Sequence, residues 1–186
     1  MKLSGHWRRL RGAAGSEIAE AALILPLLFT LLLAIYWFGR AFSIYSTINH
    51  AARQAVLTAA APACANCAAA CVWNNSGMPC DSVVSDVISQ ALSAANLDPT
   101  QAKPAMPNPT PQPCPGVVPE GICATASGGN FTICRNVTLD QNSTQLQKAC
   151  GVIISFQYPY QFALPFTSLN NQNILLTAQA ETGGEN

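Results

Sequence analysis

The longest pattern in the sequence is an uncharged apolar stretch, residues 21–39, which reads AALILPLLFTLLLAIYWFG. As an α-helix it spans roughly 28 Å, close to the hydrocarbon thickness of a bilayer. Tyr36 and Trp37 near its end suit the membrane–water interface, and Arg40 closes it. The stretch is longer than the apolar core of about 7–15 residues in a cleaved secretory signal. The pattern therefore predicts a transmembrane helix over residues 16–40.

The helical pattern continues beyond Arg40. Apolar residues recur at spacings of three or four residues at Ile44, Ile48, Ala52, Ala55 and Ala59. Pro62 follows and is a natural stop for a helix. We therefore expect one helix from about Ser16 to Ala60, in which residues 41–61 form a stalk that supports a head. Pro26 lies inside this helix, where a membrane environment tolerates it or allows a kink.

The remaining residues, 62–186, predict a small head of mixed structure. A helix starts with Asp81 as its N-cap and ends near Asn96. Eight of the thirteen prolines fall within residues 98–121, which predicts an irregular, extended segment. Strands are expected at residues 122–126, 131–134, 152–160 and 174–180. Pro159 places the end of the third strand at an edge or a break. The fold class is therefore α+β: a long N-terminal helix, half of it transmembrane, and a head with one short helix and three or four antiparallel strands.

Charge is sparse and unevenly placed along the chain. Charged residues make up 10% of the sequence, and the net charge is zero, which does not suggest a basic surface for nucleic acid. Lys2, Arg8, Arg9 and Arg11 are all basic and precede the apolar stretch, whereas after Ala61 three bases face seven acids. This asymmetry predicts a single-pass protein with a cytoplasmic N-terminus and a head on the opposite side of the membrane.

All eight cysteines follow the apolar stretch, at Cys64, Cys67, Cys71, Cys80, Cys114, Cys123, Cys134 and Cys150. An even number confined to the side that faces an oxidising compartment indicates a set of structural disulfides in the head. The sequence leaves the pairing open among 105 connectivities. Two alternatives remain: zinc held by the first four cysteines, and redox chemistry at the Cys64–Cys67 pair.

A charged motif lies directly before the apolar stretch. Residues 1–15 form a basic leader that ends at Gly15, and Glu20 follows five residues later at the mouth of the membrane segment. A carboxylate inside lipid is costly and therefore calls for a partner. Cleavage after Gly15 would create a cationic α-amino group on Ser16, and Glu20 of one subunit could pair with that amine on its neighbour. Gly12 is a second candidate for the cleavage position.

The stretch RGAAGSEIAEAALILPLLFTLLLAIYWFGRAF resembles the N-terminus of TadE-like proteins, relatives of the type IV pilins found with tight-adherence pili. The shared features are the basic leader, Gly15, Glu20, Leu25-Pro26 and Phe38-Gly39-Arg40. The resemblance covers residues 8–60 and, more loosely, residues 151–181. It implies cleavage between Gly15 and Ser16 by a prepilin peptidase, and assembly with other pilins or pseudopilins.

We therefore expect a minor pseudopilin or assembly component in the bacterial inner membrane, with its head periplasmic or extracellular. His6 and His50, the two histidines, lie on opposite sides of the predicted span, which argues against a catalytic triad, and we expect no enzyme, cofactor or bound metal. The alternatives are an unprocessed, signal-anchored structural domain and a membrane-tethered thiol oxidoreductase. Four N-x-[ST] sequons leave a eukaryotic single-pass glycoprotein as a further alternative.

Overall fold

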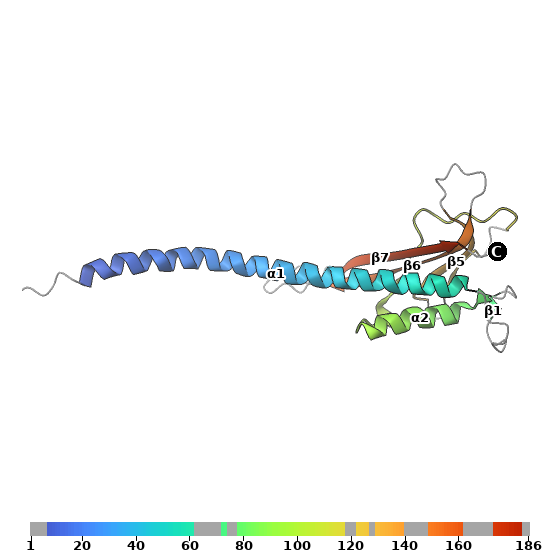
Figure 1. Ribbon diagram of the computed structural model, residues 1–186, viewed down its shortest axis with the longest axis horizontal. Helices are drawn as coiled ribbons and strands as arrows, with labels where there is room; N and C mark the ends of the chain where they lie inside the picture. The colour runs from blue at the N-terminus through green and yellow to red at the C-terminus, as the bar shows by residue number, and fades with distance from the viewer. Residues whose placement is uncertain are drawn as a thin grey trace, which may run out of the picture. The chain divides into compact units, whose positions relative to one another are not determined.

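The structure is a computed structural model that describes residues 7–61, 72–73, 78–117, 122–126, 129–139, 149–161 and 173–183. Side chains are described from residue 17 onward, except at residues 72–73. The chain divides into two compact units, residues 1–42 and residues 43–186. Figure 1 labels the main helices and strands.

Helix α1 spans Trp7–Ala60. Its end confirms the predicted stop near Ala60, but the expected start near Ser16 was wrong, because the helix begins nine residues earlier and includes part of the basic leader. Arginine, leucine and alanine are strong helix formers, and Gly12 and Gly15 together do not outweigh them. Pro26 lies inside α1, as predicted. Of the described helices, α1 is the one long and apolar enough to cross a membrane.

Helix α2 spans Asp81–Ala94 and confirms the predicted short helix. The prediction that Asp81 is the N-cap was wrong: Cys80 occupies that position and makes no capping side-chain hydrogen bond, while Asp81 lies in the first turn. The helix ends two residues before the predicted Asn96. Asn96 takes a left-handed conformation with φ of 57°, which α-helical backbone does not allow and which asparagine tolerates well.

The head contains a five-stranded antiparallel sheet in which β6 is paired along both of its sides. Its strands are β3 (Lys103–Pro104), β4 (Cys123–Thr125), β5 (Thr132–Thr138), β6 (Cys150–Gln161) and β7 (Asn173–Gly183). The short strands β1 (Val72–Trp73) and β2 (Met78–Pro79) form a separate pair. The sheet has one strand more than expected, because β3 lies in the proline-rich segment that we predicted to be irregular. Its two residues pair with Phe156 and Gln157 of β6.

Strand β6 explains the imperfect alternation of its sequence. Residues 151–156 are all buried, since both faces of this strand are covered. A strand buried on both faces shows a continuous apolar run in place of a clean alternation. Pro159 does not end the strand, which continues to Gln161. On the side away from β7, no described strand pairs with β6 beyond Gln157, so Pro159 does lie beside an open edge, where its missing N–H is tolerated.

One face of the sheet packs against α2 and the C-terminal part of α1, which lie together beside β5, β6 and β7 in Figure 1. The buried residues that α1 contributes are mostly small: Ile48, Ala51, Ala52, Ala55, Val56 and Ala59. Short side chains allow a helix backbone to approach the sheet closely. From α2 come Val84, Ile88 and Leu92, and Phe131 and Phe156 meet edge to face on the sheet. The helical periodicity read from the sequence at residues 48–59 is therefore the core face of α1.

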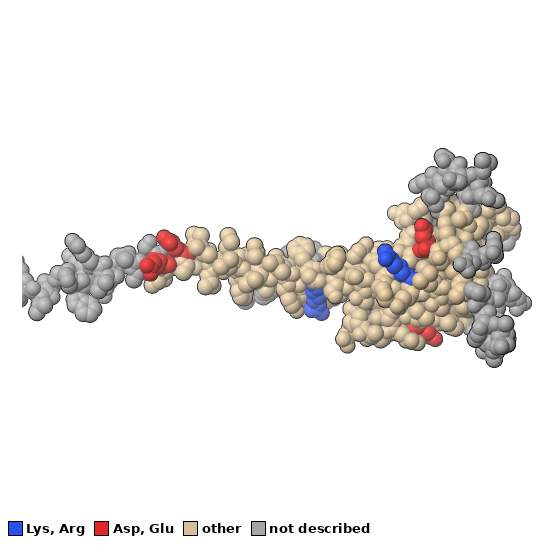
Figure 2. All heavy atoms as spheres, in the orientation of Figure 1, with Lys and Arg blue, Asp and Glu red and all other residues tan. Residues whose placement is uncertain are grey.

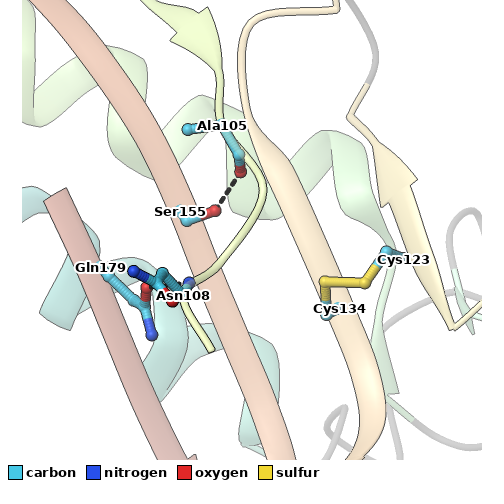
Figure 3. The surroundings of a disulfide bond; sticks show 6 residues. All are labelled: Ala105, Asn108, Cys123, Cys134, Ser155 and Gln179. Carbon is cyan, nitrogen blue, oxygen red and sulfur yellow. Dashed lines mark hydrogen bonds between the residues drawn. A yellow bond between two sulfur atoms is a disulfide. The ribbon is translucent and has the colours of Figure 1, made fainter. Parts of the chain in front are cut away.

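The opposite face of the sheet carries a smaller cluster and covalent links. Cys134, Val137, Leu139 and Ile153 are buried there. A disulfide joins Cys123 on β4 to its cross-strand partner Cys134 on β5, as Figure 3 shows. In the same view the Ser155 hydroxyl donates to the Ala105 carbonyl, and the backbone N–H of Asn108 donates to Gln179 Oε1 at 3.0 Å. These two hydrogen bonds hold the segment after β3 against β6 and β7.

Asp98 ties the end of α2 to the sheet. Its Oδ1 accepts hydrogen bonds from the Thr100 hydroxyl at 2.7 Å and from the Thr100 N–H at 2.9 Å, and these bonds lower the pKa of Asp98 below its ordinary 3.8. A lowered pKa stabilises the folded state above that ordinary value, and the contribution is lost as pH falls through the folded-state pKa. The N–H of Asp98 donates to the Tyr158 hydroxyl at 3.1 Å, and burial raises the pKa of Tyr158.

Gly151 provides a test of the packing between β6 and β7. A Cβ atom placed there would lie 2.0 Å from the Thr182 carbonyl oxygen and 2.6 Å from Leu139 Cδ1. Gly151→Ala is therefore expected to lower the free energy of unfolding by about 1–3 kcal/mol, as overpacking does in other cores. Gly183→Ala is the matched control, since a Cβ at Gly183 meets nothing within 4 Å. Urea denaturation of the full-length protein in detergent measures both, and equal midpoints would contradict the close contact.

Candidate functional site

The first compact unit exposes a long apolar helix surface. In α1 the exposed large apolar side chains before residue 43 are Ile18, Leu23, Ile24, Leu25, Leu27, Leu28, Phe29, Leu31, Leu32, Ile35, Tyr36, Phe38 and Phe42. Soluble proteins rarely expose contiguous apolar patches larger than a few hundred Å². A surface of this size requires lipid or other apolar helices around it. The predicted transmembrane segment is therefore consistent with the described structure.

Charge marks the two ends of this apolar surface. Glu17 and Glu20 lie at its start, Arg40 lies near its end, and no charged residue lies between Glu20 and Arg40. Figure 2 shows this stretch of helix as a surface without acidic or basic side chains. Glu20 is exposed, and the described residues form no ion pair with it. Any group that neutralises Glu20 within lipid would thus belong to another molecule or to a residue outside the described part.

The predicted processing residues lie on the same helix. The backbone of α1 includes Gly15 and Ser16, less than two turns before Glu20. At these two residues the structure describes the backbone alone. Gly12, the second candidate for cleavage, is also in α1. The structure places Gly15, Ser16 and Glu20 on one continuous element, and no described residue forms an ion pair with Glu20.

Within α1 the burial changes sharply after residue 43. Phe42 is 73% exposed, whereas Ile48 is fully buried in the core of the head. Most large apolar residues up to Phe42 are exposed, although Leu33 and Trp37 are half-buried, while the buried residues from Ile48 to Ala59 follow one face. An all-round apolar helix suits lipid, and a one-faced helix suits a soluble core. The sequence of α1 therefore encodes two environments in succession.

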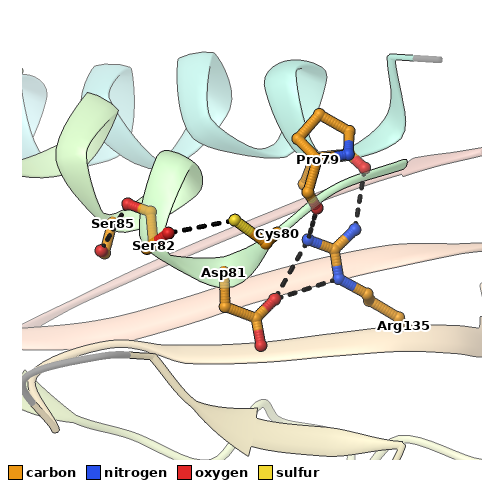
Figure 4. Close-up of polar contacts among 7 residues, drawn as sticks. Pro79, Cys80, Asp81, Ser82, Ser85 and Arg135 are labelled. Carbon is orange, nitrogen blue, oxygen red and sulfur yellow. Dashed lines mark hydrogen bonds and ion pairs between the residues drawn. The ribbon is translucent and has the colours of Figure 1, made fainter. Parts of the chain in front are cut away.

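A buried arginine connects the end of α1 to the start of α2; Figure 4 shows its contacts. Arg135 on β5 is 2% exposed and forms an ion pair with Asp81, with Nη2 at 3.1 Å and Nε at 3.2 Å from Oδ1. Its Nη2 also donates to the Pro79 carbonyl at 2.8 Å, and its Nη1 donates to the Ala59 carbonyl at 3.0 Å. One guanidinium group thus joins α1, α2, β2 and β5.

The chemistry of this cluster suits its position. Ala59 is in the last turn of α1, where carbonyl groups lack helical partners, so the guanidinium satisfies an otherwise orphaned acceptor. Asp81 is in the first turn of α2, where the helix dipole favours a carboxylate. A bulge between Arg135 and Val137, with Asn136 at φ of 54°, shifts the register of β5 at this point. The bulge lets Arg135 share the helix-covered face while Val137 joins the opposite face.

The sequence pattern does not indicate this cluster. It predicts a helix cap at Asp81 and no role for Arg135. The available signal was a solitary arginine within a predicted strand of the head, because a charge there requires a buried partner or an exposed face. The partner lies 54 residues away, and spacing does not identify it.

The disulfide prediction is confirmed for the cysteines that the structure describes. Cys114 is bonded to Cys150, and Cys123 is bonded to Cys134. Cys80 is also disulfide-bonded. The zinc alternative needs Cys80 as a thiolate, so it does not agree with this structure. Cys64, Cys67 and Cys71 lie outside the described residues, and the redox alternative at Cys64 and Cys67 falls there.

A long exposed apolar helix followed along the chain by a small α+β head defines a class of proteins with one candidate membrane span. Comparison with known families gives a match over residues 15–57 to the family described as TadE-like protein. The match confirms the resemblance read from the sequence and identifies a TadE-like segment. No curated protein and no solved structure gave a match.

Arg135→Met is expected to lower the free energy of unfolding by about 3–5 kcal/mol, because it leaves Asp81 without its partner and two carbonyls without a donor. Arg53→Met is the control: Arg53 is exposed on the same helix that Arg135 contacts, and surface changes usually stay within about 0.5 kcal/mol. The measurement is urea denaturation of the full-length protein with its disulfides intact. A loss in Arg135→Met no larger than in Arg53→Met would show that the cluster contributes nothing.

Proposed function

We propose that this protein is a minor pseudopilin or assembly component of a tight-adherence-type pilus. The observation that carries the proposal is the position of the family match along α1. The TadE-like match begins at Gly15 and runs to residue 57, and it contains the whole exposed apolar part of α1 from Ile18 to Phe42. The segment shared with the family therefore includes the helix surface that needs lipid or neighbouring helices and part of the helix face buried in the head, and it ends before the first cysteine.

The proposed sequence of events follows from the placement of α1. The apolar surface holds the protein in the inner membrane, with the basic leader on the cytoplasmic side and the head on the outer side. A prepilin peptidase cuts between Gly15 and Ser16. The new helix end then packs with the helices of other pilins or pseudopilins, which replace lipid around its apolar residues. The protein itself is a substrate and a building block, and is not an enzyme.

Glu20 is proposed to set the register of this packing. A charge within lipid costs about 2.5–3.5 kcal/mol on insertion scales. The α-amino group of a cleaved Ser16 is cationic at neutral pH. Pairing Glu20 with that amine on a neighbour removes both costs, but only when the two helices have the right axial offset. Such a pair contributes more to correct register than to stability.

Two other functions are alternatives to this proposal. An unprocessed anchor for an extracytoplasmic structural domain needs the same helix but no cleavage at Gly15. A thiol oxidoreductase needs a reactive pair at Cys64 and Cys67. Two measurements distinguish the three functions: the N-terminus of the mature protein, and the alkylation of free thiols without reductant. We favour the pseudopilin because Gly15 and Glu20 have no role in either alternative, whereas the basic leader would orient an unprocessed anchor equally well.

The first test is the N-terminus of the mature protein. We expect the wild-type chain from its native membrane to start at Ser16 and a Gly15→Leu variant to remain uncut, as measured by intact mass and N-terminal sequencing. Gly12→Leu is the matched control and should still be cut after Gly15. A mature chain that starts at Ala13, and whose cleavage is lost only in Gly12→Leu, would assign the cleavage position to Gly12 in place of Gly15. A start at Met1 in every variant would exclude processing and favour the anchored domain.

The second test concerns Glu20. Glu20→Gln is expected to be cleaved normally but to enter the pilus assembly at least about tenfold less, since the Ser16 amine of its neighbour is left unpaired in lipid. Glu17→Gln is the control, because it removes a carboxylate from the same exposed region of the helix. The readout is the amount of mature protein that co-purifies with the other pilus subunits from detergent-solubilised membranes. Equal recovery of both variants would mean that Glu20 does not direct assembly.

A further inference from the structure

The outer edge of β7 lacks a described partner. Strand β7 pairs with β6 through eleven consecutive positions, from Asn173 opposite Gln161 to Gly183 opposite Gly151, without a bulge. No other described strand pairs with β7. In the described part of the chain, no further backbone hydrogen bond involves its residues. One full row of backbone N–H and C=O groups therefore faces away from the sheet.

Two contacts show which residues form that row. The Thr182 carbonyl oxygen lies against the Cβ position of Gly151, so residue 182 directs its carbonyl toward β6. Pro159 has no N–H and stands opposite Leu175, which suits a position where β7 makes no hydrogen bond to β6. In an antiparallel strand, alternate residues direct their backbone N–H and C=O groups toward the neighbouring strand and away from it. Since the register is unbroken, both contacts indicate that even-numbered residues of β7 face β6. The outward backbone groups belong to Leu175, Thr177, Gln179 and Glu181.

The other edge of the sheet is short and protected, whereas β7 is not. Strand β4 has three residues and is tied to β5 by the Cys123–Cys134 disulfide. Strand β3 has two residues, one of them Pro104. Natural sheets protect exposed edges with short strands, prolines, bulges or lysines. The sequence of β7, NILLTAQAETG, contains no proline or lysine, and its pairing contains no bulge.

We propose that β7 is a docking edge that accepts an extended strand from another protein by β-augmentation, which enlarges the sheet of the head. The backbone row of Leu175, Thr177, Gln179 and Glu181 supplies the hydrogen bonds. Residues 173–180 are uncharged and Ile174 and Leu175 are both 45% exposed, while Glu181 is the one charge on the strand. The fitting partner strand is therefore uncharged along most of its length, with a basic residue opposite Glu181.

A different protein fits this edge better than a second copy. Figure 1 shows β7 running in the same direction as the C-terminal part of α1. Antiparallel pairing of two β7 strands would turn residues 43–60 of the two copies in opposite directions, whereas the membrane topology proposed above requires the same direction in both copies. The remaining edges of a second copy, β3 and β4, are too short to match eleven residues. The proposal does not depend on cleavage at Gly15.

The test uses a matched pair of substitutions at Thr177, which is exposed and directs its N–H outward. Thr177→Pro removes that N–H and blocks strand addition, but it leaves the hydrogen bonds to β6 in place. Thr177→Val keeps the backbone and removes the hydroxyl, which accepts a hydrogen bond from Gln157 Nε2 at 3.2 Å. The probe is the photoreactive residue p-benzoyl-phenylalanine in place of Leu175, in the full-length protein in its native membrane. The adduct is measured by mass.

We expect an adduct with a different protein, unchanged in Thr177→Val and reduced about tenfold or more in Thr177→Pro, since a lost hydrogen bond and a proline ring act together at the interface. Slow hydrogen exchange at Ala178 and Ala180 in both variants verifies that the β6–β7 ladder is intact. Equal adduct yields from the two variants, or no adduct in either, would overturn the docking edge. An adduct with twice the mass of the chain would overturn the choice of partner.

Discussion

The structure depends on one constraint: α1 must satisfy two environments along a single helix. Up to Phe42 most of its large apolar side chains are exposed, as lipid or neighbouring helices require. From Ile48 to Ala59 a narrow face of mostly small residues is buried against the sheet. Helix α1 runs from Trp7 to Ala60 and therefore includes both stretches.

The head compensates for its modest size with long-range connections. Disulfides join β4 to β5 and Cys114 to β6, and Cys80 before α2 is also bonded. The Arg135 guanidinium adds a polar connection between the end of α1 and the start of α2. Burying a charge costs free energy, so this cluster is better understood as a device that fixes the arrangement of four elements than as a source of stability. Its position holds the last turn of α1 against the sheet.

The proposed pilus function and the proposed docking edge use separate parts of the protein. Assembly through the helix concerns Gly15, Ser16, Glu20 and the exposed apolar surface that follows. Strand addition concerns the outward backbone of β7 in the head. A protein that enters or assists an assembly through its helix is thereby left with a head surface for a second partner. The family match covers the first part and ends at residue 57, before the head strands begin.

The sequence by itself determined the membrane-spanning helix, its extension to Ala60, the second helix and the main strands, because these follow from local periodicity and from proline and turn residues. It also pointed to the TadE-like segment through Gly15, Glu20 and Phe38-Gly39-Arg40. Local signals misplaced the start of α1 and the role of Asp81. Only the tertiary structure decided the described disulfide pairs, the contact of Arg135 with Asp81 and Ala59, the added strand β3 and the outward row of β7. Each of these depends on residues far apart in the chain, whose proximity is set by packing and register, and residue spacing carries no information about that proximity.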